Sequence, residues 1–151
     1  MKLHRYKAQG KRGLFDEQNS IELLSEIGNP LEMISKVIDF AMFRPTLENK
    51  LLNTNKKNNA GAKPFDVVLM FKILILQRYY GLGDKQIEYQ IIDRISFKNF
   101  LGLATGDKIP DEKTVWAFRE SLTHAGLVED LFNQFKNYLE SKELIFNQGQ
   151  M

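Results

Sequence analysis

Cysteine is absent from this chain of 151 residues, which excludes disulfide scaffolds, thiolate zinc fingers and thiol redox switches. The two histidines, His4 and His124, lie too far apart in the sequence to indicate a metal cage. The N-terminus carries charge but lacks the apolar segment of a signal peptide. The most apolar stretch, residues 67–80, falls short of the ~20 residues that span a bilayer. We therefore expect a cytoplasmic protein with no membrane partner.

Patterns typical of catalysis are also missing. Neighbouring carboxylates occur at residues 16–17, 111–112 and 129–130, but adjacent residues on a helix point in different directions and rarely share a metal or a proton. The Gly-Leu-Gly sequence at 81–83 lacks the Lys-Ser/Thr that completes a phosphate-binding loop. No serine or threonine has a histidine placed to activate it. We assign no catalytic residue, no metal ligand, no cofactor and no small-molecule substrate to this chain.

Helical periodicity dominates what remains. The 43% hydrophobic and 26% charged content is ordinary for a folded domain, and no strand pattern or internal repeat stands out. We predict an all-α fold, a compact multi-helix bundle with helix-turn-helix-like elements and a flexible basic N-terminal arm. Its predicted parts are the arm (1–13), an N-terminal helical hairpin (14–52), a basic linker (53–64) and a helical core (65–151), which together form one domain.

In the predicted hairpin, Asp16 caps a first helix that ends at residues 28–30, Gly-Asn-Pro. Pro30 suits the first turn of a second helix, whose inner face is expected to include Ala41 and Met42. A break at Arg44-Pro45 precedes a short third helix through residues 47–52.

In the predicted core, Asp66 caps a helix over residues 67–80. That helix is apolar on almost every face, which is typical of a buried central helix. Asp84, Ser96 and Asp111 are each expected to cap a further helix. A last helix carries an apolar stripe at three- and four-residue spacing over residues 127–139.

The net charge of +2 is unevenly distributed. Residues 1–13 hold five basic and no acidic side chains, and residues 53–63 hold three basic and no acidic side chains. Segments of this kind are typical of arms that follow phosphates, but a solubilising tail and a polar loop have the same composition. Charge alone leaves both interpretations open.

Nucleic-acid signals are better than enzyme signals. The helices at 67–80 and 84–92, joined by a glycine-containing turn, match the start of a helix-turn-helix arrangement. The helix that opens at Asp111 places Lys113, Thr114 and Arg119 at or near its exposed face, where they could meet phosphates or base edges. An ordinary amphipathic helix with solvated charges remains the alternative. Aromatic residues at helical spacing usually pack, so we expect a core role for four of them: Phe97, Phe100, Trp116 and Phe118.

Six segments follow one another along the chain: KPFDVVLMFK (63–72), LQRYYGL (76–82), QIEYQ (86–90), DRISF (93–97), FLGL (100–103) and IPDEKTVWAFR (109–119). Taken together, they resemble one family, the N-terminal domain of bacterial insertion-sequence transposases of the IS-five-like group. The sequences LFD (14–16) and GNPL (28–31) match what precedes that core. The resemblance covers the chain from about residue 14 to its last residue.

This resemblance implies a helical module that binds the terminal inverted repeats of double-stranded transposon DNA and supports dimerisation. In that family the catalytic domain follows this module, and its Asp-Asp-Glu triad holds two divalent metal ions. We therefore expect this chain to lack the active site. The implied DNA contacts are Lys113, Thr114 and Arg119, with Lys85, Arg94 and Lys98 as secondary candidates.

Two other functions stay open. The first is a protein–protein module that assembles the transposition complex, or inhibits a full-length partner through mixed dimers, using the apolar helices at 67–80 and 127–139. The second is an independent small enzyme, which would need carboxylates gathered from distant helices.

Overall fold

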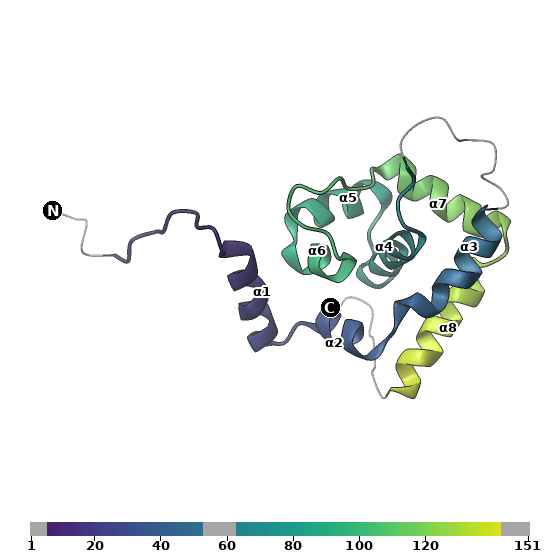
Figure 1. Cartoon of the computed structure of the whole chain (residues 1–151), viewed down its shortest axis with the longest axis horizontal. Helices are drawn as coiled ribbons and strands as arrows, with labels where there is room; N and C mark the ends of the chain where they lie inside the picture. The colour runs from purple at the N-terminus through teal and green to yellow at the C-terminus, as the bar shows by residue number, and fades with distance from the viewer. Residues whose placement is uncertain (1–5, 53–62, 143–151) are drawn as a thin grey trace.

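The computed structural model describes residues 6–52 and 63–142, and within them every element of regular secondary structure is a helix (Figure 1). The elements, in chain order, are α1 (Asp16–Ile27), α2 (Pro30–Val37), the 3₁₀ helix η1 (Phe40–Phe43), α3 (Arg44–Leu52), α4 (Val67–Tyr80), α5 (Asp84–Asp93), α6 (Ile95–Leu101), α7 (Glu112–His124) and α8 (Val128–Ser141). The predicted all-α bundle is confirmed.

Helix α4 lies at the centre of the bundle, with α5, α6 and α7 around it (Figure 1). Its predicted bounds and its central position are confirmed, because eight of its residues are buried and Phe71 and Ile73 are fully so. Asp66 caps it as expected, since its Oδ2 accepts from the backbone N–H groups of Val68 (3.1 Å) and Leu69 (3.2 Å). At its end, Gly81 adopts a left-handed conformation (φ 66°) that glycine tolerates without steric cost. The turn therefore sends the chain directly into α5.

One hydrophobic core joins residues from both sides of the predicted linker. Phe43 of η1 packs against Phe71 of α4, with ring centroids 4.9 Å apart, and Phe40 stacks on Phe135 of α8 at 5.9 Å. Leu47 of α3 is fully buried in the same cluster. The division into a hairpin and a core stays a prediction, because residues 53–62 of the proposed linker lie outside the described residues. Residues 1–5 of the proposed arm lie outside them as well.

The end of α2 differs from the expectation. Ala41 and Met42 were predicted on an inner face, and both are exposed. The helix ends at Val37, and Asp39 then caps the 3₁₀ turn by accepting from the Ala41 backbone N–H at 3.1 Å. Ile38 and Asp39 are extended and interrupt the helix, and Phe40 and Phe43 of the following 3₁₀ turn are the residues buried in the core.

Three predicted caps are wrong. Helix α1 has Phe15 at its N-cap, and the carboxylate of Asp16 accepts from the Gly13 N–H instead. Arg94, not Ser96, holds the N-cap of α6, without a side-chain cap. Gly83, not Asp84, holds the N-cap of α5, and its N–H donates to the Gln86 side chain at 2.7 Å.

Helix α1 buries none of its residues. It packs against α6 and lies at the edge of the bundle, where the Thr105 hydroxyl donates to Glu17 at 2.6 Å (Figure 1). Leu23 is 58% exposed and Ile27 is 82% exposed. The last helix, α8, is the opposite case, since Leu131, Phe132, Phe135 and Leu139 of its apolar stripe are buried in the core. Most apolar residues of α4 and α8 therefore stabilise this chain's own core.

Candidate nucleic-acid interface

Helix α7 carries the main candidates for DNA contact and packs against α4, α5 and α8. Asp111 caps it as predicted, because its Oδ1 accepts from the Thr114 backbone N–H at 2.8 Å. Glu88 of α5 reaches the same end and accepts from the Glu112 backbone N–H at 2.7 Å. Two of the first N–H groups of α7 thus already have carboxylate acceptors, so this helix start is less open to a phosphate than the sequence indicated.

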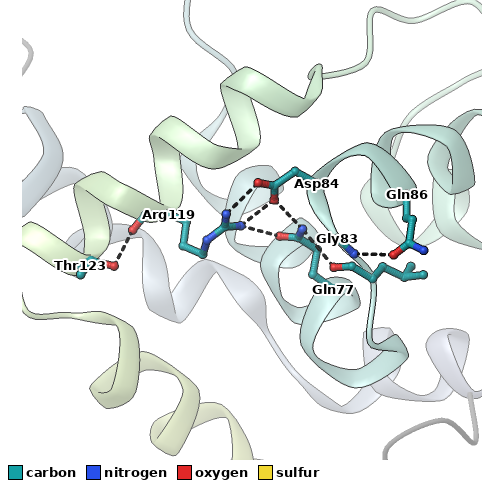
Figure 2. A network of polar contacts seen from close by, with 7 residues as sticks. Gln77, Gly83, Asp84, Gln86, Arg119 and Thr123 are labelled. Atoms are coloured by element: carbon teal, nitrogen blue, oxygen red, sulfur yellow. Dashed lines mark hydrogen bonds and ion pairs between the residues drawn. The ribbon is translucent and has the colours of Figure 1, made fainter.

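Arg119 lies inside a network that joins α4, α5 and α7 (Figure 2). Its guanidinium binds both carboxylate oxygens of Asp84, at 2.7 and 2.8 Å, and also donates to the Gln77 side-chain oxygen at 3.2 Å. The Gln77 amide in turn donates to Asp84 (2.8 Å) and to the Leu82 carbonyl (3.3 Å). A bidentate guanidinium–carboxylate pair fixes orientation as well as distance. The network therefore sets how α7 lies against α4 and α5.

The charges of this network stabilise each other. The hydrogen bonds from Arg119 hold the pKa of the Asp84 carboxyl below its usual value, against the opposing effect of burial. The hydrogen bonds to Asp84 likewise raise the pKa of Arg119. Both groups are therefore ionised at neutral pH, and the positive charge of Arg119 is neutralised within the fold.

Two of the secondary candidates are also engaged within the fold. The Arg94 guanidinium lies over the rings of Phe97 and Tyr80, 4.4 and 5.0 Å from their centroids. The Lys98 ammonium donates to the Ile92 carbonyl, near the C-terminal end of α5, at 2.6 Å. These contacts connect α6 to α5 and α4, and both side chains are half-buried.

Lys85 and Lys113 have a different environment. Both are exposed, and neither forms an ion pair with any carboxylate in the described part of the chain. Thr114 is half-buried, and its side-chain hydrogen bond is the main cause that lowers the pKa of Asp111. Of the six predicted site residues, the structure therefore leaves two lysines available to a partner.

Sequence reasoning missed an exposed aromatic residue. Trp116 was predicted in the core but is 54% exposed, whereas Phe97 and Phe100 are buried as predicted and Phe118 is half-buried against the core. The polar residues one turn away from Trp116, Lys113 and Glu120, were the signal that this position faces outward.

A second exposed aromatic residue, Tyr89, lies on α5 and is 64% exposed. Glu88, next to it in the chain, contacts the start of α7. We call Lys85 and Tyr89 of α5 together with Lys113 and Trp116 of α7 the α5–α7 face. Its four exposed residues lie on two helices that pack against each other. Two carry available ammonium groups and two carry large rings, which are the side-chain types that contact phosphates and bases.

No group of three or more His, Asp or Glu side chains among residues 6–52 and 63–142 is gathered so as to hold a metal ion. In the same part of the chain, no helix combines the length and apolar character needed to cross a bilayer.

Residues 19–121 match the family model described as Transposase domain (DUF772). The match covers more than half of the chain. The chain belongs to this transposase-domain family. The resemblance stated from the sequence is thereby confirmed at the level of a transposase-family protein, and no solved structure matches the chain significantly.

Proposed function

We propose that this domain is the DNA-binding module of an insertion-sequence transposase of the IS-five-like group and recognises the terminal inverted repeats of its element. The α5–α7 face is the surface proposed to meet the duplex, with α4 and α5 as the supporting helices of a helix-turn-helix-like arrangement. Strand cleavage, with its Asp-Asp-Glu carboxylates and divalent metal ions, is assigned by this proposal to a separate catalytic domain.

One observation carries the proposal within the transposase-domain family. Lys85 and Lys113 are the two available cations among the six candidates, and they lie on helices that pack against each other. Phosphate contacts by lysine supply affinity and position a module on DNA. The exposed side of α7 then lies close enough to the duplex for its side chains to contact bases.

Arg119 has a different role in this proposal. Its guanidinium is bound to Asp84 at both oxygens, so it positions α7 and does not itself contact DNA. This replaces the expectation from sequence that Arg119 is a direct contact, and it separates two kinds of variant that would otherwise look alike.

The test is fluorescence-anisotropy titration of a labelled terminal-repeat duplex and of a scrambled duplex at two salt concentrations. We expect tighter binding to the repeat and a steep loss of affinity with salt, as counterions are released. Lys113→Ala and Lys85→Ala should each weaken binding to both duplexes and reduce the salt slope by about 1. Arg119→Lys, which keeps the charge but loses the bidentate geometry, should weaken the preference for the repeat more than the salt slope.

The matched control is Lys36→Ala, because Lys36 is a well-exposed lysine on α2 that pairs with Glu32 at 3.1 Å. It should leave affinity and salt slope unchanged. Equal affinity for the repeat and the scrambled duplex would contradict end recognition. Equal losses from Lys36→Ala and Lys113→Ala would contradict the assignment to the α5–α7 face.

A second candidate function, self-assembly, is favoured by α1. This helix holds four acidic and no basic residues and exposes Leu23 and Ile27. The exposed segment before it carries three basic residues, Lys7, Lys11 and Arg12. In a two-fold dimer each basic segment could lie on the acidic helix of a second copy.

Sedimentation analysis would detect the dimer, and the charge reversals Glu22→Lys and Glu26→Lys should abolish it. A monomer at high concentration would contradict this second function.

A further inference from the structure

Trp116 is the only tryptophan of the chain, and it lies on the exposed side of α7. The indole is one of the largest apolar groups a protein can bury, and exposed tryptophans concentrate at surfaces that bind a partner. Trp116 is 54% exposed, so the described residues leave much of its surface uncovered. Its position next to Lys113 connects it to the surface already proposed for DNA.

The ring borders a hollow of about 290 Å³ lined by Asp84, Glu112, Lys113 and Trp116. The hollow lies where the starts of α5 and α7 meet, and Asp84 and Glu112 are the first residues of those helices. The indole therefore forms one side of a small depression whose surface is mostly apolar and whose other lining residues are charged. This combination suits a flat ring that carries polar groups at its edge.

The charges around the hollow balance. Asp84 is neutralised by Arg119, which binds it at 2.7 and 2.8 Å, and Glu112 and Lys113 carry opposite charges. A phosphate would meet the Glu112 carboxylate in this space, so the balance favours a neutral ligand over an anion. The oxygens of Glu112 can accept hydrogen bonds from an amino group, as acidic side chains do from the N4 amino group of cytosine.

We infer that the hollow beside Trp116 binds one unpaired nucleobase of the bound DNA, stacked on the indole and donating through its exocyclic amino group to Glu112. Lys113 contacts the phosphate attached to that nucleotide. This inference rests on the proposed function, since it adds base capture to a module that binds duplex DNA through the same face. Cytosine and adenine carry the required amino group, whereas thymine presents an oxygen at the corresponding position.

The experiment uses the full chain and the emission of its single tryptophan. Three labelled duplexes share one repeat sequence and end blunt, with a short cytosine overhang or with a short thymine overhang. We expect the cytosine overhang to bind about 5- to 150-fold more tightly than the blunt end, the range typical of stacking one base on an aromatic side chain. Binding should quench Trp116 emission and protect it from acrylamide, with smaller effects for the thymine overhang.

Variants separate stacking from hydrogen bonding. Trp116→Ala should remove the gain from the overhang, as measured by anisotropy of the labelled DNA, while Trp116→Phe should keep part of it. Glu112→Gln should reduce the preference for cytosine over thymine. The matched control is Tyr89→Ala, which removes an exposed aromatic ring from the same face but not from the hollow. Circular dichroism and thermal melting establish that each variant is folded.

The outcomes distinguish base capture in the hollow from duplex binding by the α5–α7 face. Binding of all three duplexes with equal affinity and unchanged Trp116 emission overturns base capture and leaves the DNA-binding proposal standing. Absence of binding to every duplex overturns the proposed function, and base capture with it. Quenching by cytidine monophosphate alone, with no preference among the duplexes, overturns the assignment to DNA and identifies the hollow as a site for free nucleotides.

Discussion

Helices α1 and α4 are of similar length, 12 and 14 residues, and both carry several large apolar side chains. Helix α4 buries eight residues, including Phe71 and Ile73, whereas α1 buries none and holds four carboxylates. The difference lies in their neighbours, because α4 is surrounded by other helices and α1 packs mainly against α6 at the edge of the bundle (Figure 1). Apolar content therefore does not set the contribution of a helix to stability. The contacts available to its faces do.

The DNA-binding proposal depends on the contacts that α4 makes with α5 and α7. Helix α4 supplies Gln77 to the network that holds Arg119 and Asp84, and so connects the rigid core to the α5–α7 face. A surface positioned in this way can keep side chains in fixed geometry for recognition. Helix α1 has no comparable network, which suits a role in contacts that form only with a partner.

The largest expected effect is the removal of a ring at the centre. Phe71 is fully buried and lies 4.9 Å from the ring of Phe43 and 5.7 Å from that of Phe132. Phe71→Ala should lower the free energy of unfolding by about 3–5 kcal/mol, through lost burial and the cavity left behind. Urea denaturation measures it. A loss below about 1 kcal/mol, typical of a surface change, would contradict the statement that the buried side chains of α4 dominate the stability of the fold.

The next effect concerns the network that joins the core to the DNA-binding face. Arg119→Ala should cost about 1–3 kcal/mol, because it leaves Asp84 and Gln77 without their main donor in a partly buried position. The 34% exposure of the Arg119 side chain places the expected value in the lower half of that range. Arg119→Lys should cost less, since an ammonium keeps the charge but not the bidentate geometry. If Arg119→Ala leaves the denaturation midpoint unchanged, Arg119 does not position α7.

The pH dependence of stability tests the contribution of the ionised Asp84–Arg119 pair. Arg119 lowers the pKa of Asp84 in the folded state, whereas the pKa of this carboxyl in the unfolded chain is about 3.9. The ionised pair therefore stabilises the fold fully above the unfolded pKa, and its contribution is lost as the pH falls through the lower folded pKa. Asp84→Asn should be less stable than the original protein at pH 7, and the gap should narrow below pH ~4. A gap that is constant from pH 7 to pH 3 would show that the ionised carboxylate is not what stabilises the network.

Much of the fold was predictable because its signals are local. The bounds of α4 follow from the Asp66 cap and from an apolar run that leaves no polar face, and the cap of α7 at Asp111 follows from the same local chemistry. The expected caps at Asp84 and Ser96 are wrong, because α5 begins after Gly83 and α6 begins after Arg94. Asp84 bonds to Arg119, which is distant in the sequence, and that partner cannot be read from local propensity.

The candidate site was less predictable for the same reason. Lysines and arginines on predicted helices look equivalent in a sequence, but Arg94 and Lys98 bind to rings and a carbonyl of the fold while Lys113 does not. Trp116 was misassigned because its ring type favoured the core more strongly than its polar neighbours favoured the surface. Its helical position relative to buried Val115 and Leu122 was the better indicator.

The smallest expected effect on stability is that of a substitution in α1. Leu23 of α1 is 58% exposed and is not among the buried residues of the core, so Leu23→Ala should change the free energy of unfolding by no more than about 0.5 kcal/mol. Amide hydrogen exchange should be faster in α1 than in α4, because a helix with few buried contacts opens without global unfolding. If instead α1 is protected as strongly as α4, or Leu23→Ala costs as much as Phe71→Ala, then α1 is covered in solution. The self-assembly function would then gain support, since a second copy is the partner whose basic segment matches the acidic surface of α1.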